Sequence, residues 1–582
     1  MKTTLLLLLV ILMVSCENKV ENIKTDFPTP FEISNKTETA TYDQVIDFYI
    51  KLSKEFSTIN IQTIGITDSG KPLHVVTYSV KGDFDFKKLG KNNTMMLINN
   101  GIHPGESDGI DATMLLFRDL ASNEITSPSK TIISTIPVYN VGGALNRNST
   151  SRANQNGPLE YGFRGNAKNY DLNRDFIKTD TKNTKTFTEI YHLINPDVFI
   201  DNHVSNGADY QYTLTHLFTQ HNKLGGKLGD YIHDDLMPQL QDSLSSSGWD
   251  ITPYVNVFNS PPEKGFEQFM DYPRYSTGYT TLWNTLGMMV ETHMLKPYDK
   301  RVEGTYQLML KMIAISEKDG EKIRDMRDSA INTFYDNEYY TTAWQIDTTK
   351  ATNYTFKGYE VDTITSEITN FKRLKYKREI PIETEITYKD YYTASDSVRV
   401  PKAYILGKQW QNVLNKLDLN KIAYTTLQND SMIHVESYHI DEYETYTSPY
   451  EGHYPHYNTT VKTANTTKEF KAGDIIIPVN QPGFRYILET LEPSAVDSFF
   501  NWNFFDTILQ QKEGFSPYVF EDTALEMLNN DSILKSAFEN KKKLDTTFNK
   551  NWYQQLDWLF KQSKLYEKAH LQYPIYRIID LP

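Results

Sequence analysis

The sequence predicts an α/β fold in which a mixed sheet is flanked by helices and followed by a β-rich accessory region. Over residues 43–328, apolar runs typical of strands alternate with amphipathic segments typical of helices. Several of these runs are nearly continuous, as in strands that are covered on both faces. Later the composition turns to Tyr, Thr, Asn and β-favouring runs, so residues 329–582 are expected to form the accessory region, which ends with a helix.

The individual elements follow from these runs. In open α/β sheets, ligands bind beyond the carboxyl ends of the strands. The unusual polar residues of this chain cluster at those ends. Strands are expected at 73–80, 94–99, 131–139, 198–201 and 286–290, and helices at 108–121, 180–194, 224–247 and 299–328.

The first sixteen residues have the features of a secretory signal. Lys2 precedes an apolar run that is too short to span a bilayer comfortably, and the run ends at Ser15 and Cys16. Cys16 is the only cysteine, which excludes an intramolecular disulfide. The stretch before it resembles the lipobox of bacterial lipoproteins, with Met13 where leucine is usual. We therefore expect a signal peptide over 1–15, a lipid on Cys16 and a polar tether over 16–42.

This anchor would hold the chain on a bacterial membrane, outside the cytoplasm, in the periplasm or at the cell surface. The formal net charge is -14 at pH 7. Because phosphate binding depends on a basic footprint, the acidic balance argues against nucleic acid as a partner.

The first polar cluster is His-Pro-Gly-Glu, between an expected strand and an expected helix. His103 and Glu106 lie three residues apart on a tight turn and present one nitrogen and one oxygen to the same cation. The spacing alone is weak evidence, because about one or two such matches arise by chance among 13 histidines, and His439 with Glu442 is another. Two glycines and a proline distinguish the first match, since they indicate a particular turn.

A second cluster follows the strand expected at 198–201. His203 in this position supplies a third ligand and leaves the fourth position of a tetrahedral zinc ion for water, as in catalytic zinc sites. We therefore predict that His103, Glu106 and His203 bind one Zn²⁺ ion.

Two more clusters contain charged groups, Tyr-Asp-Leu-Asn-Arg-Asp at 170–175 and Val-Glu-Thr-His at 290–293. Glu291 ends an expected apolar strand, where a buried carboxylate is costly unless it is paired or functional. An ion pair with a nearby lysine or arginine is the structural alternative.

Taken in order, these motifs resemble the zinc carboxypeptidases of the carboxypeptidase A type. The resemblance rests on His-Pro-Gly-Glu, then Asp-Leu-Asn-Arg, then a histidine beyond a strand, then Val-Glu-Thr-His. It covers residues 43–328 and implies that they form a catalytic domain of that family.

The resemblance also implies roles for single residues. His103, Glu106 and His203 match the zinc ligands. Glu291 matches the glutamate that takes a proton from the attacking water and passes it to the leaving amine. Asp171 matches the carboxylate that orients the first zinc histidine.

Other matching residues would hold the substrate. Asn173 and Arg174 match the pair that binds the free C-terminal carboxylate, a task suited to the planar guanidinium fork. Arg152 matches the arginine that polarises the scissile carbonyl and stabilises the oxyanion, and Tyr275 is taken as the active-site tyrosine. The rivals for the last two roles are Arg147 for the arginine, and Tyr272 and Tyr279 for the tyrosine.

One departure affects the substrate. Digestive members of the family have an arginine directly before the ligand glutamate, whereas this chain has Gly105. Relatives that act on other amides or on side-chain glutamates also contain His-Pro-Gly-Glu, so the substrate is less well determined than the metal.

The resemblance implies a zinc metallocarboxypeptidase that hydrolyses C-terminal bonds of extracytoplasmic peptides by glutamate-assisted attack of water activated at zinc. Its partners would be peptides with a free C-terminus. One alternative is an amide hydrolase of the same fold that acts on cell-wall peptides or side-chain glutamates. The other is a non-catalytic surface binding lipoprotein. Retention of the ligands together with Glu291 favours the enzyme, and the accessory region would shape the cleft or bind a partner.

Overall fold

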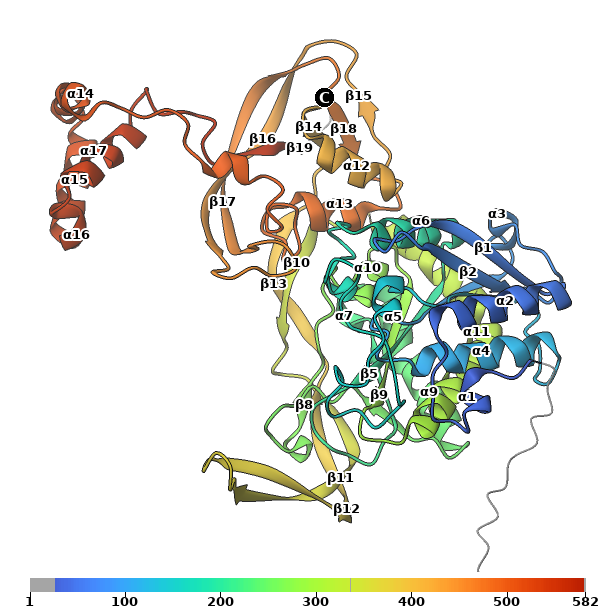
Figure 1. Cartoon of the computed structure of the whole chain (residues 1–582). Helices are drawn as coiled ribbons and strands as arrows, with labels where there is room; N and C mark the ends of the chain where they lie inside the picture. The colour runs from blue at the N-terminus through green and yellow to red at the C-terminus, as the bar shows by residue number, and fades with distance from the viewer. Residues whose placement is uncertain (1–26, 335–336, 580–582) are drawn as a thin grey trace, which may run out of the picture.

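A computed structural model describes residues 27–334 and 337–579. The predicted signal peptide, Cys16 and the first part of the predicted tether lie outside the described residues. An eight-stranded mixed sheet with helices on both sides forms the centre (Figure 1), so the predicted α/β fold class is confirmed. In spatial order its strands are β1 (Ile59–Ile66), β2 (Pro72–Tyr78), β4 (Thr131–Ile136), β3 (Thr94–Asn99), β5 (Val198–Ser205), β9 (Leu286–His293), β6 (Leu214–Phe218) and β7 (Ile251–Pro253).

The parallel strands β4, β3, β5 and β9 form the middle of this sheet. Every residue of β3 and β5 is buried, which agrees with their continuous apolar sequences. Because the four strands run in one direction, their carboxyl ends meet at the same edge of the sheet. The register of β5 and β9 places His203 opposite Glu291 at this edge.

Helices cover both faces of the sheet. The main helices of this domain are α2 (Tyr42–Glu55), α4 (Asp108–Ala121), α6 (Lys182–Ile194), α9 (Met237–Ser245), α10 (Ser276–Thr281) and α11 (Tyr298–Thr333). Asn202 of β5 points toward α11 and bonds Asn100, the residue after β3. Asp201 and Phe199 point to the other face, where they contact Ser276 of α10 and Phe187 of α6.

Several element boundaries differ from the prediction. β5 and β9 extend to Ser205 and His293, so His203 and Glu291 lie within strands and not beyond them. The helix expected at 224–247 is present over residues 226–245, where α8 (Gly226–Asp230), a π-helical turn (Tyr231–Leu236) and α9 follow one another without a gap. Gly225 and Gly226 have φ of 70° and 54°, and this backbone conformation separates the helix from the short α7 (His221–Leu224) before it.

The C-terminal region is rich in strands, as predicted. A ribbon of β10 (Tyr339–Ile346) and β13 (Tyr392–Arg399) connects two parts. One part is the long hairpin of β11 (Thr352–Thr365) and β12 (Lys372–Lys389), which joins β8 (Phe266–Glu267) of the first domain, the domain built on the eight-stranded sheet. The other is a six-stranded sheet made of β15 (Thr425–Thr426), β18 (Ile475–Pro478), β14 (Ala403–Leu406), β19 (Gln572–Ile578), β16 (Ser431–Thr445) and β17 (His456–Phe470), with helices α12 (Gln411–Leu419) and α13 (Phe484–Leu491).

This six-stranded sheet and the first domain share one continuous hydrophobic core. Trp283 stacks on Tyr486 at 6.0 Å, and the hydroxyl of Tyr279 donates to Asn420 at 2.7 Å. The C-terminal region is therefore packed firmly against the first domain.

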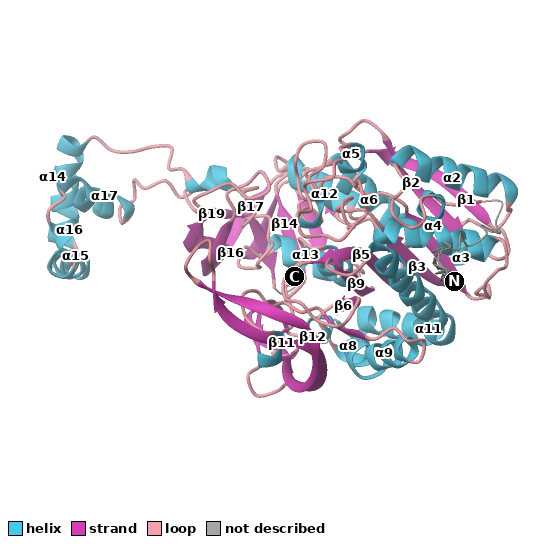
Figure 2. Ribbon diagram, turned by 60° about the horizontal axis from the view of Figure 1, so that its bottom comes forward, coloured by secondary structure: helices cyan, strands magenta, loops and turns pink. Residues whose placement is uncertain are grey.

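A group of helices between α13 and β19 projects from the body and has its own small core (Figure 2). The expected terminal helix corresponds to α17 (Trp552–Lys561). It is not the last element, because the chain continues into β19, which pairs with β14 in the six-stranded sheet. The preceding helices are α14 (Pro517–Asn530), α15 (Ser532–Leu544) and α16 (Thr546–Asn549). Over the described residues, no helix has the length and apolar character needed to cross a membrane.

Part of the segment assigned to the tether is folded. Phe31, in α1 (Pro30–Ile33), is buried, and Glu32 bonds Arg118 of α4 at 2.8 Å. The N–H of Ala40 donates to Asp111 at 3.3 Å. Residues 27–41 therefore belong to the first domain, and only the residues before them are left to the predicted tether.

Candidate metal centre

The three predicted ligands meet at the carboxyl edge of the sheet. His103 and Glu106 lie on the turn between β3 and α4, and His203 lies near the end of β5. All three are buried, and their ligand atoms lie within 4.8 Å of one another. Gly101 opens the turn with φ of 65°, where a Cβ would approach Ile110 of α4 to 3.1 Å.

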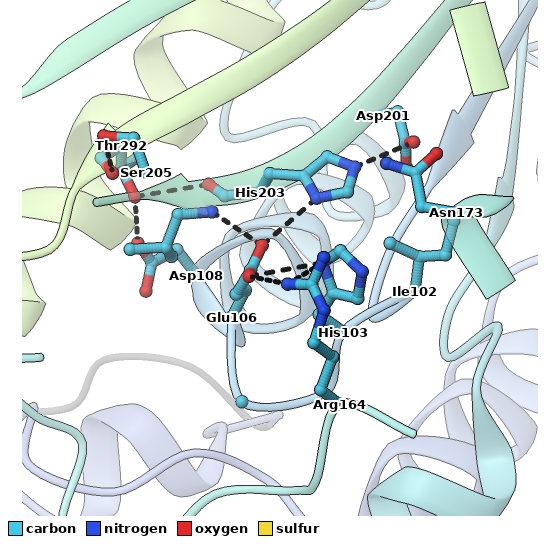
Figure 3. A network of polar contacts seen from close by, with 12 residues as sticks. Ile102, His103, Glu106, Asp108, Arg164, Asn173, Asp201, His203, Ser205 and Thr292 are labelled. Carbon is cyan, nitrogen blue, oxygen red and sulfur yellow. Dashed lines mark hydrogen bonds and ion pairs between the residues drawn. The ribbon is translucent and has the colours of Figure 1, made fainter. Parts of the chain in front are cut away.

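The two imidazole rings are held so that their Nδ1 atoms face Glu106 (Figure 3). Nδ1 of His103 lies 3.2 Å and that of His203 lies 3.1 Å from the Glu106 carboxylate. Their Nε2 atoms each contact a second carboxylate at 2.9 Å, Asp171 for His103 and Asp201 for His203. This arrangement fixes the ring tautomers and directs two nitrogen lone pairs and one carboxylate inward. Two imidazoles and a carboxylate form a donor set that suits zinc.

Glu106 stays ionised in this setting. Burial alone would raise its pKa, but the neighbouring His103 and Arg152 lower the pKa of Glu106 well below its usual range. Its Oε2 also accepts the N–H of Val204 at 2.9 Å. The carboxylate is thus held in place from several sides.

Glu291 lines the same cleft, a cavity of about 330 Å³. Its side chain is half-buried, and among the described residues its carboxylate has no hydrogen-bond or ion-pair partner. The structural alternative of a plain ion pair is therefore excluded. Desolvation by burial, together with the charge of Glu106, raises the pKa of Glu291 to about 8.

Arg152, one of the predicted catalytic residues, reaches the centre from the loop after α5 (Val141–Leu145). Its Nη1 donates to Glu106 at 2.8 Å, and its Nε donates to Gln155 at 2.9 Å. A Cβ at Gly105 would lie 3.1 Å from both Cγ and Cδ of Arg152. The space beside the ligand glutamate, which an arginine at 105 would have used, is thus filled by the stem of Arg152.

The rival Arg147 points away from the cleft and donates to the carbonyls of Thr39 and Glu160. Among the tyrosines, only Tyr275 of the three candidates lines the cleft within the described chain. The hydroxyl of Tyr279 is buried against Asn420, and that of Tyr272 faces the backbone of Trp344.

The predicted substrate-binding residues lie together. The Arg174 guanidinium lies 4.6 Å from the centre of the Tyr275 ring, and both residues line the cleft. Asn173 is buried, and its Oδ1 accepts the N–H of Ser276 at 3.1 Å. This bond joins the 170–175 cluster to the segment that contains Tyr275.

Two residues near the ligands were missed in the sequence. Asp201 supports His203 and is itself bonded by Asn99 at 3.0 Å. The two-residue period of a strand places residues 201 and 203 on one face, and this signal was available. Arg164 bonds Asp171 at 2.8 Å and lies 3.6 Å from Glu106. Nothing in the local sequence distinguished Arg164 from other arginines.

The C-terminal sheet also reaches the centre. Glu451, in the turn between β16 and β17, accepts the N–H of Asp171 at 2.8 Å. The Arg274 guanidinium lies 5.9 Å from the Tyr450 ring and forms an ion pair with Asp497 at 2.7 Å. This region therefore supports both segments that hold the Arg174 and Tyr275 pair.

Several solved structures are similar to part of this chain. The chain is similar to the solved structure of a metallo-carboxypeptidase from Burkholderia cenocepacia, with 14% identity, 48% of this chain and 70% of that chain covered, and a TM-score of 0.37. It is also similar to carboxypeptidase A from Helicoverpa armigera, with 12% identity, 48% of this chain and 73% of that chain covered, and a TM-score of 0.36. A metallo-carboxypeptidase from Pseudomonas aeruginosa is similar at 12% identity, with 48% and 70% covered and a TM-score of 0.36. No curated protein matches the chain.

The family described as zinc carboxypeptidase matches residues 45–205. This range includes the His-Pro-Gly-Glu and Asp-Leu-Asn-Arg motifs and His203. Residues 45–205 therefore match the zinc carboxypeptidase family, and this match confirms the resemblance that the motifs predicted.

Proposed function

We propose that this chain is a zinc metallocarboxypeptidase that removes residues from the free C-terminus of extracytoplasmic peptides. The observation that supports this most directly is the position of Glu291, a carboxylate without a partner in the cleft that contains the three ligands. A binding protein has no need of such a group, since a desolvated carboxylate is costly to keep.

Zinc bound by His103, Glu106 and His203 would supply Lewis acidity, which acidifies water and polarises a carbonyl. Positive charge at the metal site would favour the ionised form of Glu291, which accepts the proton of the attacking water and delivers it to the leaving amine. Arg152 directs its guanidinium into the cleft, where it stabilises the developing oxyanion. Arg174, with Asn173, takes the C-terminal carboxylate of the substrate.

Zinc content and cleavage of matched peptides test this function. We expect about one zinc per chain in the wild type and in Glu291→Gln. The wild type should cleave C-terminally free peptides in preference to their amidated forms. In Glu291→Gln, kcat should fall by a factor of about 10²–10⁴.

Other results would contradict the proposal. Bound zinc without cleavage of any peptide would favour the binding lipoprotein. Equal cleavage of free and amidated peptides would remove the role given to Arg174. Preference for a γ-glutamyl linkage or a cell-wall peptide would favour the alternative amide hydrolase.

We further propose that the protein is anchored to a bacterial membrane by a lipid on Cys16 and acts outside the cytoplasm. The support is the sequence of residues 1–16, in which a charged start and a short apolar run precede this cysteine. Labelling with a fatty acid and cell fractionation test the anchor. The wild type should be labelled and sediment with membranes, whereas Cys16→Ser should not be labelled.

A further inference from the structure

The strand β12 begins with a basic stretch in an otherwise acidic chain. Residues 372–378 read Lys-Arg-Leu-Lys-Tyr-Lys-Arg, although the formal net charge of the chain is -14. These residues lie on the long β11–β12 hairpin, at one end of the first domain (Figures 1 and 2).

A groove of about 770 Å³ lies between this stretch and two loops of the first domain, residues 207–208 and 258–264. Lys264, Lys372 and Arg373 line it, and none of the described carboxylates does. Arg378 bonds Asp209 at 2.6 Å and thereby fixes the hairpin against the first of these loops.

The cations of the groove have no partner of opposite charge. Among the described residues, Lys264, Lys372 and Arg373 form no ion pair, and Lys372 donates only to the hydroxyl of Thr365. By contrast, Lys377 of the same stretch pairs with Glu360 at 3.0 Å and Asp362 at 2.9 Å. The positive charge of the groove is therefore available to a ligand.

The groove adjoins the metal cleft. Phe258 lines both, and its side chain is 56% exposed. Gly207 lines the groove and directly follows Asn206, which lines the cleft. Gly207 has φ of 115°, and a Cβ there would approach the carbonyl of Val257 to 3.1 Å. A residue without a side chain is therefore needed where the groove meets the cleft.

The groove lies at the opposite end of the cleft from Arg174. The Asp171–Arg174 segment is contacted by Glu451 of the six-stranded sheet, whereas Phe258 lies beside the β11–β12 hairpin. Figure 1 shows this sheet and this hairpin at opposite ends of the first domain. A peptide whose C-terminal carboxylate is held by Arg174 therefore extends toward Phe258 with its upstream residues.

We propose that this groove binds acidic side chains of the peptide substrate, upstream of the bond that is cleaved. The inference rests on the proposed carboxypeptidase function and adds a substrate class to it. Unpaired cations in a groove attract carboxylates, and each exposed contact of this kind gives up to about fivefold in affinity.

A peptide panel tests the groove. Each peptide has the same two C-terminal residues and carries either glutamate or glutamine at the second, third and fourth positions before the scissile bond. We expect the wild type to favour the glutamate peptides through a lower KM, by about fivefold to tenfold. The preference should shrink when the salt concentration rises from about 0.05 to 0.5 M, because screening weakens exposed charge contacts.

The double variant Lys372→Glu/Arg373→Glu should abolish or reverse the ratio of kcat/KM between the glutamate and glutamine peptides. Lys564→Glu/Lys568→Glu, with the same charge change on exposed residues near the projecting helices, serves as the matched control and should keep the wild-type ratio. Binding of the same peptides to Glu291→Gln, measured by fluorescence anisotropy, should show the same preference.

Three results would overturn the inference. One is cleavage of both peptide classes with equal KM by wild type and groove variant, which leaves the carboxypeptidase function intact. Another is binding of anionic phospholipid vesicles that the groove variant loses, without any peptide preference. The third is a preference that the groove variant retains. By contrast, if no peptide of the panel is cleaved, the proposed function itself fails.

Discussion

The backbone N–H of Asp171 donates a hydrogen bond of 2.8 Å to the carboxylate of Glu451. The two residues lie far apart in sequence, and the bond ties the segment containing Arg174 to the six-stranded C-terminal sheet. The neighbouring Gly452 has φ of 80°, and a Cβ there would lie 2.7 Å from the hydroxyl of Tyr170. The C-terminal region is thus a structural part of the substrate-binding end of the cleft.

Replacement of Glu451 should weaken substrate binding more than it slows the chemical step. In Glu451→Ala the Asp171 N–H loses its acceptor, and we expect KM to rise about fivefold, as for the loss of one hydrogen bond. Glu451→Gln keeps an acceptor oxygen and should restore most of the wild-type KM. Glu444→Ala, at the end of β16, is the control. A rise in KM that Glu451→Gln shares would assign the effect to charge and not to this bond.

Asp201 should tune the metal affinity through His203. In Asp201→Asn the charge that holds Nε2 of His203 is removed, so zinc affinity should fall about 10- to 100-fold. Competition with a chromophoric chelator measures the zinc Kd. The exposed Asp522→Asn on α14 is the control and should bind zinc like the wild type. An unchanged Kd in Asp201→Asn would show that this carboxylate does not support the ligand.

The position of the Arg152 side chain should depend on the absence of a side chain at Gly105. The methyl group of Gly105→Ala would lie 3.1 Å from two atoms of Arg152 and 3.0 Å from the carbonyl of Gly162, so the guanidinium must move. We expect kcat/KM to fall by roughly 10- to 100-fold, because small displacements of catalytic groups are costly, while zinc content stays the same. Gly514→Ala, where no atom lies within 4 Å of the new methyl group, is the control. Full activity of Gly105→Ala would contradict the role of Arg152.

Asp111 should make the protein less stable as the pH rises from about 4 to 7. Desolvation by burial raises the pKa of Asp111 from 3.8 to about 6, although the hydroxyl of Tyr298 and the N–H of Ala40 donate to it. Its stabilising contribution is therefore complete below pH 3.8 and is lost as the pH rises through about 6. The shift corresponds to about 2–3 kcal/mol of unfolding free energy.

Thermal unfolding of Asp111→Asn at pH 4.5 and 7.5 checks this contribution. The variant lacks the titrating group, so its Tm should rise relative to that of the wild type as the pH increases. The pH dependence is the readout, because the amide changes absolute stability at every pH. A constant difference in Tm between the two proteins would show that Asp111 does not titrate in this range.

The sequence predicted much of the first domain because its strands and helices are indicated by patterns of neighbouring residues. The central strands are continuous apolar runs, and α4 was expected at the residues where it occurs, since its apolar period and its position after a turn are visible in the chain. Irregularities inside helices were harder to locate. The glycine pair at 225 and 226 delays the start of one expected helix by two residues, and the amphipathic pattern does not reveal the π-helical turn within that helix.

By itself, the sequence determined the α/β class, the three ligand candidates and Glu291, because each of these residues belongs to a short motif next to an apolar strand. The basic stretch on β12 is also visible in the sequence, but only the tertiary structure decided that it faces a groove beside the cleft. The same holds for Asp201, Arg164 and Glu451, and for the stem of Arg152 over Gly105. These contacts join segments that are distant in the chain and are brought together by the packing of the sheet. The local sequence pattern of one segment does not indicate which distant segment will pack against it.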